Sequence, residues 1–123
     1  MVVDDNRDNR KLFRAVLSRQ GHVVWEFETG VGLAEAIAAA EAQPDLVLLD
    51  IQLPDLDGFE VLALLRRHCP PTLRVVALTA FAAAADRSRA LAAGFDGYIT
   101  KPIDITRFPA LVRGAIAGES ITE

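Results

Sequence analysis

Three aspartates follow short apolar segments of the sequence and could act together as acids or metal ligands. Asp50 comes directly after the apolar run LVLL at 46–49, and Asp4 and Asp5 come directly after residues 1–3. An apolar run without alternation is typical of a strand buried on both faces, where a carboxylate is costly unless it is paired. The position of Asp50 therefore indicates that this residue has a functional role. Local roles stay open: Asp4 and Asp5 could cap a following helix, and Asp50 could be a turn residue.

Two further strand-like segments end in side chains that donate hydrogen bonds. RVVALT ends at Thr79, and GYIT ends at Thr100 and is followed by Lys101. If these ends meet the three aspartates in one cleft, the like charges of the carboxylates require a cation. Oxygen ligands suit Mg²⁺ or Mn²⁺ better than zinc, and a lysine and a hydroxyl beside them would bind a phosphoryl group. Taken alone, Lys101 would be a solvated surface residue and Thr79 an ordinary strand end, so the hypothesis depends on their joint placement.

The elements that would position these residues alternate between strands and helices along the whole chain. Apolar residues recur at helical spacing in some segments and form short β-rich or uninterrupted runs in others. The strands are expected at 1–3, 22–27, 45–50, 74–79 and 97–100, and the helices at 8–20, 31–42, 59–68, 82–94 and 104–117, the last with a start nearer Arg107 because Pro109 suits a first turn.

This order predicts an α/β fold with one parallel sheet. Strand–helix–strand connections are right-handed, so the helices cover both faces of the sheet in three layers, α/β/α. In such sheets a ligand lies beyond the carboxyl ends of the strands, where the strand order switches. If the first and third strands are neighbours, Asp4, Asp5 and Asp50 converge there.

Composition narrows the class of protein. The chain has 123 residues, of which 51% are hydrophobic and 24% charged, as expected for one globular domain. Its formal net charge of −4 argues against direct nucleic-acid or anionic-membrane binding. No apolar run approaches the roughly 18–20 residues that cross a bilayer, and the start of the chain does not read as a signal peptide. With a single cysteine, Cys69, a cytoplasmic location is expected.

Four motifs together resemble the receiver domain of two-component response regulators, of the chemotaxis-receiver type. They are VVDDN, LVLLDIQLPDLDGFE, VVALTAFA and GYITKPI, in the order and spacing of that family. The resemblance implies a flavodoxin-like, doubly wound five-stranded parallel sheet of order 2-1-3-4-5. It implies a receiver domain over residues 1–117, with a first strand that is short at its amino end, and a short C-terminal tail at 118–123.

For the acidic residues the resemblance implies a phosphoacceptor site. Asp50 would accept a phosphoryl group from a histidine kinase or a histidine phosphotransfer protein. The side chains of Asp5 and Asp50 and the backbone carbonyl of Gln52 would hold Mg²⁺ or Mn²⁺, with Asp4 acting through a water. Such a domain is a signalling module rather than an enzyme, beyond its own phosphorylation and slow dephosphorylation.

The remaining motif positions would bind and read out the phosphoryl group. Lys101 would pair with its oxygens, with a cis peptide bond before Pro102, and Thr79 would hydrogen-bond to it. Tyr98, otherwise a half-buried strand aromatic, would then rotate inward. The resemblance implies that this changes a protein-binding face on the fourth helix, fifth strand and fifth helix, including residues 82–85 and Ile103.

Two positions are expected to tune the lifetime of the phosphoryl group. Gln52 lies two residues after Asp50, and Phe81 lies two residues after Thr79. We expect the Phe81 ring to restrict the attacking water. Asp55 and Asp57 are expected to be loop and cap residues, with Gly58 permitting the turn.

Two other functions compete with this interpretation. The chain could be a receiver-like interaction module that is never phosphorylated, although the full set of site residues argues against it. An aspartyl-phosphate hydrolase of the haloacid dehalogenase type needs a second acid two residues after the nucleophile, where Gln52 stands. A nucleotide-binding fold would need a glycine-rich loop after the first strand, which the sequence lacks.

Overall fold

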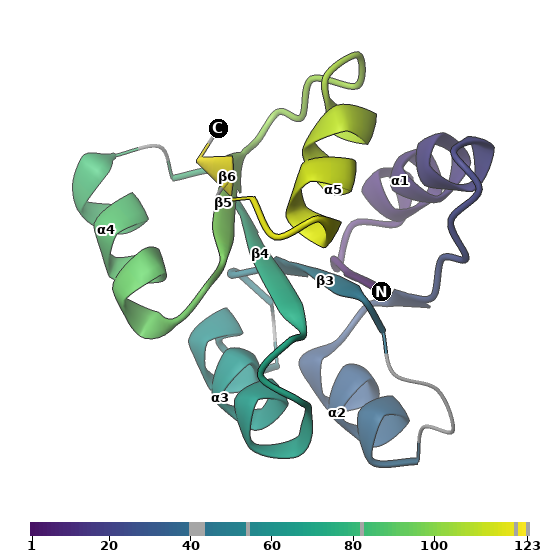
Figure 1. Cartoon of the computed structure of the whole chain (residues 1–123). Helices are drawn as coiled ribbons and strands as arrows, with labels where there is room; N and C mark the ends of the chain where they lie inside the picture. The colour runs from purple at the N-terminus through teal and green to yellow at the C-terminus, as the bar shows by residue number, and fades with distance from the viewer. Residues whose placement is uncertain (40–43, 54, 82, 120, 123) are drawn as a thin grey trace.

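The fold is an alternation of strands and helices in a computed structural model that describes residues 1–39, 44–53, 55–81, 83–119 and 121–122. Figure 1 shows the elements in chain order. They are β1 (Val2–Val3), α1 (Arg7–Arg19), β2 (Glu26–Phe27), α2 (Gly30–Ala39), β3 (Leu46–Asp50), α3 (Gly58–His68), β4 (Arg74–Thr79), α4 (Ala84–Ala93), β5 (Gly97–Thr100), α5 (Phe108–Ile116) and β6 (Ile121–Thr122). The end of the expected helix at 31–42 falls on residues 40–42, which lie outside the described residues.

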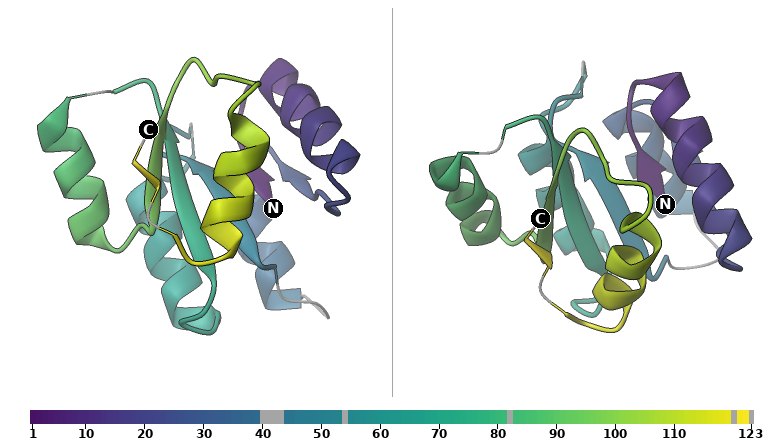
Figure 2. Two further views of the ribbon diagram at one scale, coloured as in Figure 1. Left: turned by 45° about the horizontal axis from the view of Figure 1, so that its top comes forward. Right: turned by 90° about the horizontal axis from the view of Figure 1, so that it is seen from above.

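The strands form one parallel sheet in the order β2-β1-β3-β4-β5-β6. The predicted order 2-1-3-4-5 is therefore confirmed, and β6 extends the sheet beyond β5. Helices α1 and α5 pack on one face and α2, α3 and α4 on the other, which gives three layers (Figure 2).

The central strand β3 contributes apolar side chains to both faces of the sheet. In β3, Val47 and Leu49 pack into the apolar cluster under α2 and α3, whereas Leu46 and Leu48 pack into the cluster under α1 and α5. Successive side chains of a strand point to opposite faces, so an uninterrupted apolar run fills both clusters. The run in β3 thus fixes the position of Asp50 at the carboxyl end of a rigid central strand.

The sheet is less regular at its ends than the sequence predicts. The expected strand at 22–27 is wrong over most of its length, because only Glu26 and Phe27 pair with β1. Val23 and Trp25 are 85% and 42% exposed, since β1 on that side contributes only two paired residues. β-Branched composition alone did not distinguish this exposed segment from a strand.

Helix boundaries follow capping chemistry. Asn6 caps α1 by accepting a hydrogen bond from the amide of Asn9, so neither Asp4 nor Asp5 is the cap. Helix α5 starts at Phe108, next to the start near Arg107 and not at residue 104. Pro109 lies in its first turn, as expected for a proline. Among the described residues, no helix is long and apolar enough to span a membrane.

Candidate phosphoacceptor site

The three aspartates converge at the carboxyl ends of β1 and β3. These strands are neighbours, with Val3 opposite Leu49, so residues 4–5 and residue 50 emerge at the same edge. One carboxylate oxygen from each of Asp4, Asp5 and Asp50 lies within 4.8 Å of the others. Asp4 and Asp50 are buried, whereas Asp5 is exposed. The cleft thus has two fixed acids and one that faces solvent.

Asp4 is held from several directions by the start of α1. Its Oδ1 accepts from the amide of Asn6 at 2.9 Å, and its Oδ2 accepts from Asn9 Nδ2 at 3.4 Å. Arg10 donates from Nη1 to the Asp4 carbonyl at 2.7 Å. The roles of Asn9 and Arg10 were missed at the sequence level, although their spacing from the Asn6 cap places both on the first turns of α1. These bonds fix the Asp4–Asp5 backbone and hence where Asp5 projects.

Lys101 joins the two buried acids. Its Nζ lies 2.9 Å from Asp50 Oδ2 and 3.0 Å from Asp4 Oδ2, and its side chain is 22% exposed. Burial by itself lowers the pKa of Lys101, but hydrogen bonds and charges from Asp50 and Asp4 outweigh it, so the pKa is raised above its ordinary value. The lysine is therefore a fixed positive charge in the cleft. The Lys101–Pro102 bond is cis, the isomer that the family resemblance implies.

Thr79 and Tyr98 form a second group beside the cleft. Thr79 is fully buried, and its Oγ1 accepts from the amide of Phe81 at 3.0 Å. Tyr98 is also fully buried, and its hydroxyl donates to the Phe81 carbonyl. Burial raises the pKa of Tyr98, and a hydrogen bond with Thr79 opposes that shift. The alternative in which Tyr98 is only a half-buried strand aromatic is wrong, because the residue is fully buried next to Thr79.

The loop after Asp50 is folded tightly onto the site. The amide of Gln52 donates to Asp50 Oδ1 at 2.8 Å, and Gln52 pairs with Asp57 in an isolated antiparallel bridge. Gly58 is needed for close approach rather than for an unusual turn, because a Cβ there would lie 2.6 Å from Ile51 Cα. Asp57 caps α3 by accepting from the amide of Phe59. The loop therefore holds Gln52 next to the buried carboxylate.

Asp55 has a role that the sequence alone did not reveal. Its two carboxylate oxygens accept from the amides of Gly30 and Val31 at 3.1 and 2.9 Å, at the start of α2. The hydrogen bond from Val31, together with the weaker one from Gly30, lowers the pKa of Asp55 below its ordinary value. A residue of the loop that follows Asp50 thus caps a helix 24 positions earlier in the chain.

The donor set fits a hard divalent cation. The cluster offers three carboxylates and no sulfur or imidazole, and the exposed Asp5 leaves room for water ligands. Two of the acids are already balanced in part by Lys101. A small cavity of about 190 Å³ adjoins this region and is lined by Gln52, Thr79, Phe81 and Tyr98 among others.

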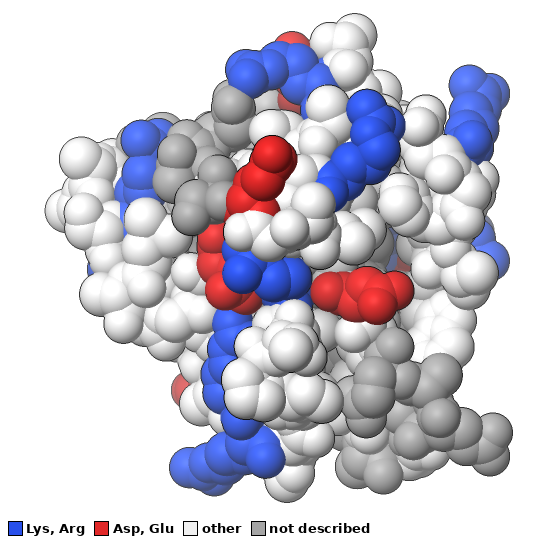
Figure 3. All heavy atoms as spheres, viewed as in Figure 1, with Lys and Arg blue, Asp and Glu red and all other residues white. Residues whose placement is uncertain are grey.

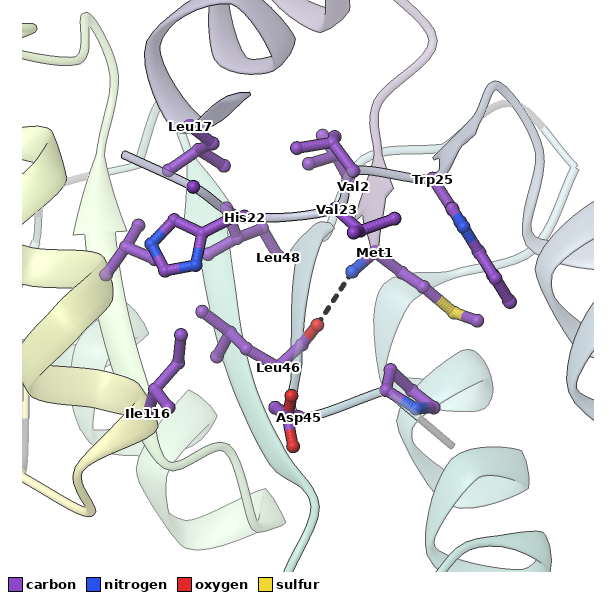
Figure 4. Close-up of a pocket in the computed structure, with 14 residues that line it drawn as sticks. Met1, Val2, Leu17, His22, Val23, Trp25, Asp45, Leu46, Leu48 and Ile116 are labelled. Carbon is purple, nitrogen blue, oxygen red and sulfur yellow. Dashed lines mark hydrogen bonds between the residues drawn. The ribbon is translucent and has the colours of Figure 1, made fainter. Parts of the chain in front are cut away.

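A second cavity, of about 440 Å³, lies at the opposite end of the sheet and contains none of these residues (Figure 4). It lies around the Met1 amine, which donates to the Leu46 carbonyl at 2.8 Å and whose pKa is lowered to about 6 by burial despite the charge of Asp45. On the face shown in Figure 3, acidic and basic side chains lie next to one another near the centre, and further basic side chains follow below them.

Comparison with known proteins defines the class of this fold and site. Residues 1–113 match the family described as response regulator receiver domain. The chain is 42% identical over 113 residues to the polar-differentiation response regulator DivK of Brucella ovis, covering 88% of this chain and 87% of that protein.

Solved structures of receiver domains have the same fold as this chain. The receiver domain of NtrX from Brucella abortus superposes with a TM-score of 0.80 at 30% identity, covering 94% of this chain and 96% of that one. A CheY-like receiver domain protein from Methanospirillum hungatei gives a TM-score of 0.82 at 25% identity, with coverage of 94% and 90%.

The chain belongs to the response regulator receiver domain family. It is a signalling domain of the two-component phosphorelay type, and its acidic cleft fits the phosphoacceptor site of that class.

Proposed function

We propose that Asp50 is the phosphoacceptor, and that the donor is a phosphohistidine of a histidine kinase or a histidine phosphotransfer protein. One oxygen of the Asp50 carboxylate attacks the phosphorus, the P–N bond breaks, and the imidazole leaves with the electron pair and takes up a proton. The observation that carries the proposal is the contact of Lys101 with both Asp50 and Asp4, because it places a cation where phosphoryl oxygens need one.

The divalent cation would be held by the side chains of Asp5 and Asp50 and the backbone carbonyl of Gln52, with Asp4 acting through a water. Mg²⁺ or Mn²⁺ bound there supplies charge neutralisation for the phosphoryl oxygens. The chain's own contribution is position: the Gln52 amide holds one oxygen of Asp50, and Lys101 holds the other.

After transfer, Lys101 would pair with phosphoryl oxygens and Thr79 would donate its hydroxyl to them. Thr79 Oγ1 accepts from the Phe81 amide and shares a hydrogen bond with the Tyr98 hydroxyl, so a bond from Thr79 to a phosphoryl oxygen would replace its bond with Tyr98. Thr79 is hydrogen-bonded to the Phe81 amide, and Tyr98 is hydrogen-bonded to the Phe81 carbonyl. A shift of Thr79 would therefore act on Phe81 and, through it, on Tyr98. In this structure the Tyr98 ring already occupies the inner position.

The surface read by a downstream protein would be the α4–β5–α5 face. It includes Ala83, Ala84, Ala85 and Ile103, with Tyr98 buried beneath the surface in this structure; residue 82 lies outside the described residues. We propose further that the receiver domain comprises residues 1–117 with a tail at 118–123, acts in the cytoplasm, and binds neither nucleic acid nor membrane directly. In this proposal it is no enzyme beyond its own phosphorylation and slow dephosphorylation.

The test is intact mass after incubation with acetyl phosphate and Mg²⁺. One added phosphoryl group is expected in the wild type, none in Asp50→Asn, and none when EDTA removes the metal. Asp57→Asn is the matched control, because asparagine also caps helices and Asp57 lies on the same loop. Equal labelling of wild type and Asp50→Asn would reject Asp50 as the acceptor, and no labelling of either would favour the non-phosphorylated interaction module.

A further inference from the structure

The end of the chain runs back along the outer edge of β5. Ile121 pairs with Gly97 and Thr122 with Tyr98, both in parallel register. Figure 1 shows β6 beside β5, between α4 and α5. A β5 edge without a neighbour would present unpaired backbone groups. Here the chain covers that edge itself, on the face that a partner is proposed to read.

The seat of Ile121 is closely fitted. Its side chain is buried with 7% exposure and belongs to the apolar cluster that α5 closes. Gly97 allows this approach, because a Cβ at that position would lie 2.9 Å from the Ile121 carbonyl oxygen and 3.1 Å from its Cβ. A glycine within a strand often marks close approach of another backbone. The contact is therefore backbone against backbone.

The turn that follows α5 is also fixed. Gly118, with φ of +95°, turns the chain after α5, and its amide donates to the Ala115 carbonyl at 3.1 Å. The Glu119 amide donates to the Gly114 carbonyl at 2.9 Å, and Arg74 Nη2 donates to the Glu119 carbonyl at 3.2 Å. These bonds hold Gly118 and Glu119 in place shortly before β6.

Tyr98 connects this strand to the phosphoacceptor region. The Lys101 amide donates to the Thr79 carbonyl on β4. Since backbone groups alternate along a strand, the amide and carbonyl of Tyr98 point away from β4 and toward β6. Its side chain bonds to the Phe81 carbonyl inside the domain. One residue thus contacts β6 through its backbone and the Thr79–Phe81 segment through its ring.

We propose that β6 (Ile121–Thr122) acts as an intramolecular strand that keeps the edge of β5 closed. A protein partner that adds an extended segment with a β-branched residue to β5 binds only after this strand has left. The inference rests on the proposed use of the α4–β5–α5 face for output. It adds that β6 competes with the partner for the edge of β5.

Amide exchange measured by NMR on the full chain tests the closed edge. Ile121→Asp removes the apolar contact, and Ile121→Val is the matched control that keeps it. We expect the Tyr98 amide to exchange at least about tenfold faster in Ile121→Asp than in the control, while the Leu78 amide in central β4 is unchanged. Gly97→Ala, which acts from the β5 side, is expected to give the same result. Equal exchange at Tyr98 in all variants would overturn the proposal.

A synthetic peptide of sequence AGESITE, identical to residues 117–123, tests the competition. At millimolar concentration it should shift the Tyr98 amide resonance in Ile121→Asp and leave Ile121→Val unchanged. Equal shifts in both variants would show that the edge is open, and no shift in either would show that it accepts no strand in trans; both results contradict the proposal. The extent of Asp50 phosphorylation, measured by intact mass, should be the same in Ile121→Asp and Ile121→Val. If neither variant is phosphorylated, that result counts against the proposed function and not against the closed edge.

Discussion

The Lys101 ammonium lies 2.9 Å from Asp50 Oδ2, although 51 positions separate the two residues in the chain. The contact exists because β3 and β5 flank β4 in the sheet, so their carboxyl ends open into one cleft. It joins a buried acid to a largely buried base, and with Asp4 it forms a charge cluster that no single segment of the chain contains.

Removal of Lys101 should destabilise the metal-free protein. In Lys101→Met, Asp4 and Asp50 lose their shared hydrogen-bond donor and counter-charge while both stay buried, which we expect to cost about 1–3 kcal/mol of unfolding free energy. Mg²⁺ should reduce this difference, because it replaces the lost positive charge. Urea unfolding with and without Mg²⁺ measures both effects, and Lys11→Met, on the exposed side of α1, is the control. A loss of stability that Mg²⁺ does not reduce would contradict the charge argument.

Asp4 and Asp5 should respond differently to the same substitution. Asp4→Asn should lower the unfolding free energy by about 1–3 kcal/mol, since the buried carboxylate accepts bonds from Asn6, Asn9 and Lys101. Asp5→Asn should leave stability nearly unchanged and weaken Mg²⁺ binding, because this carboxylate is exposed. Calorimetric titration with Mg²⁺ and urea unfolding separate the two. Similar stability losses for both variants would show that the acids are not divided in this way.

Phe81 should slow loss of the phosphoryl group. Phe81 is 53% exposed and lines the small cavity next to Thr79 and Gln52, where we expect its ring to restrict the attacking water. Phe81→Glu should therefore lose the phosphoryl group several-fold faster, as followed by intact mass over time after the donor is removed. Leu91→Glu is the control, because it places the same acid at an exposed apolar position on α4. An unchanged or slower rate in Phe81→Glu would remove Phe81 from this role.

Asp55 should make stability depend on acid pH. Its pKa is lowered in the folded state by the Val31 and Gly30 amides, so its contribution is fully present above the unfolded pKa of about 4 and is lost as pH falls through the folded value. The urea midpoint of Asp55→Ala should lie below that of the wild type at pH 7, with a gap that narrows below about pH 4. Glu28→Ala, which removes an exposed acid just before α2, is the control. A gap that stays constant down to acid pH would contradict the capping role.

The sequence predicted the central sheet well, because β3 and β4 are uninterrupted apolar runs that only a doubly covered parallel sheet can bury. It also indicated Asp4, Asp5, Asp50, Thr79 and Lys101 as one group, since all follow strand-like segments. Two other long-range contacts were not predictable. The role of Asp55 depends on the approach of the loop to α2, and β6 has only two residues, whose pairing depends on the glycine at position 97.

Trapping the acyl phosphate at residue level tests the central claim most directly. After incubation with acetyl phosphate and Mg²⁺, borohydride reduction converts a phosphorylated aspartate into homoserine, which peptide mass spectrometry can locate. Homoserine is expected at position 50 alone, and only when the metal is present. Homoserine at position 4 or 5, or at none of the aspartates, would contradict it.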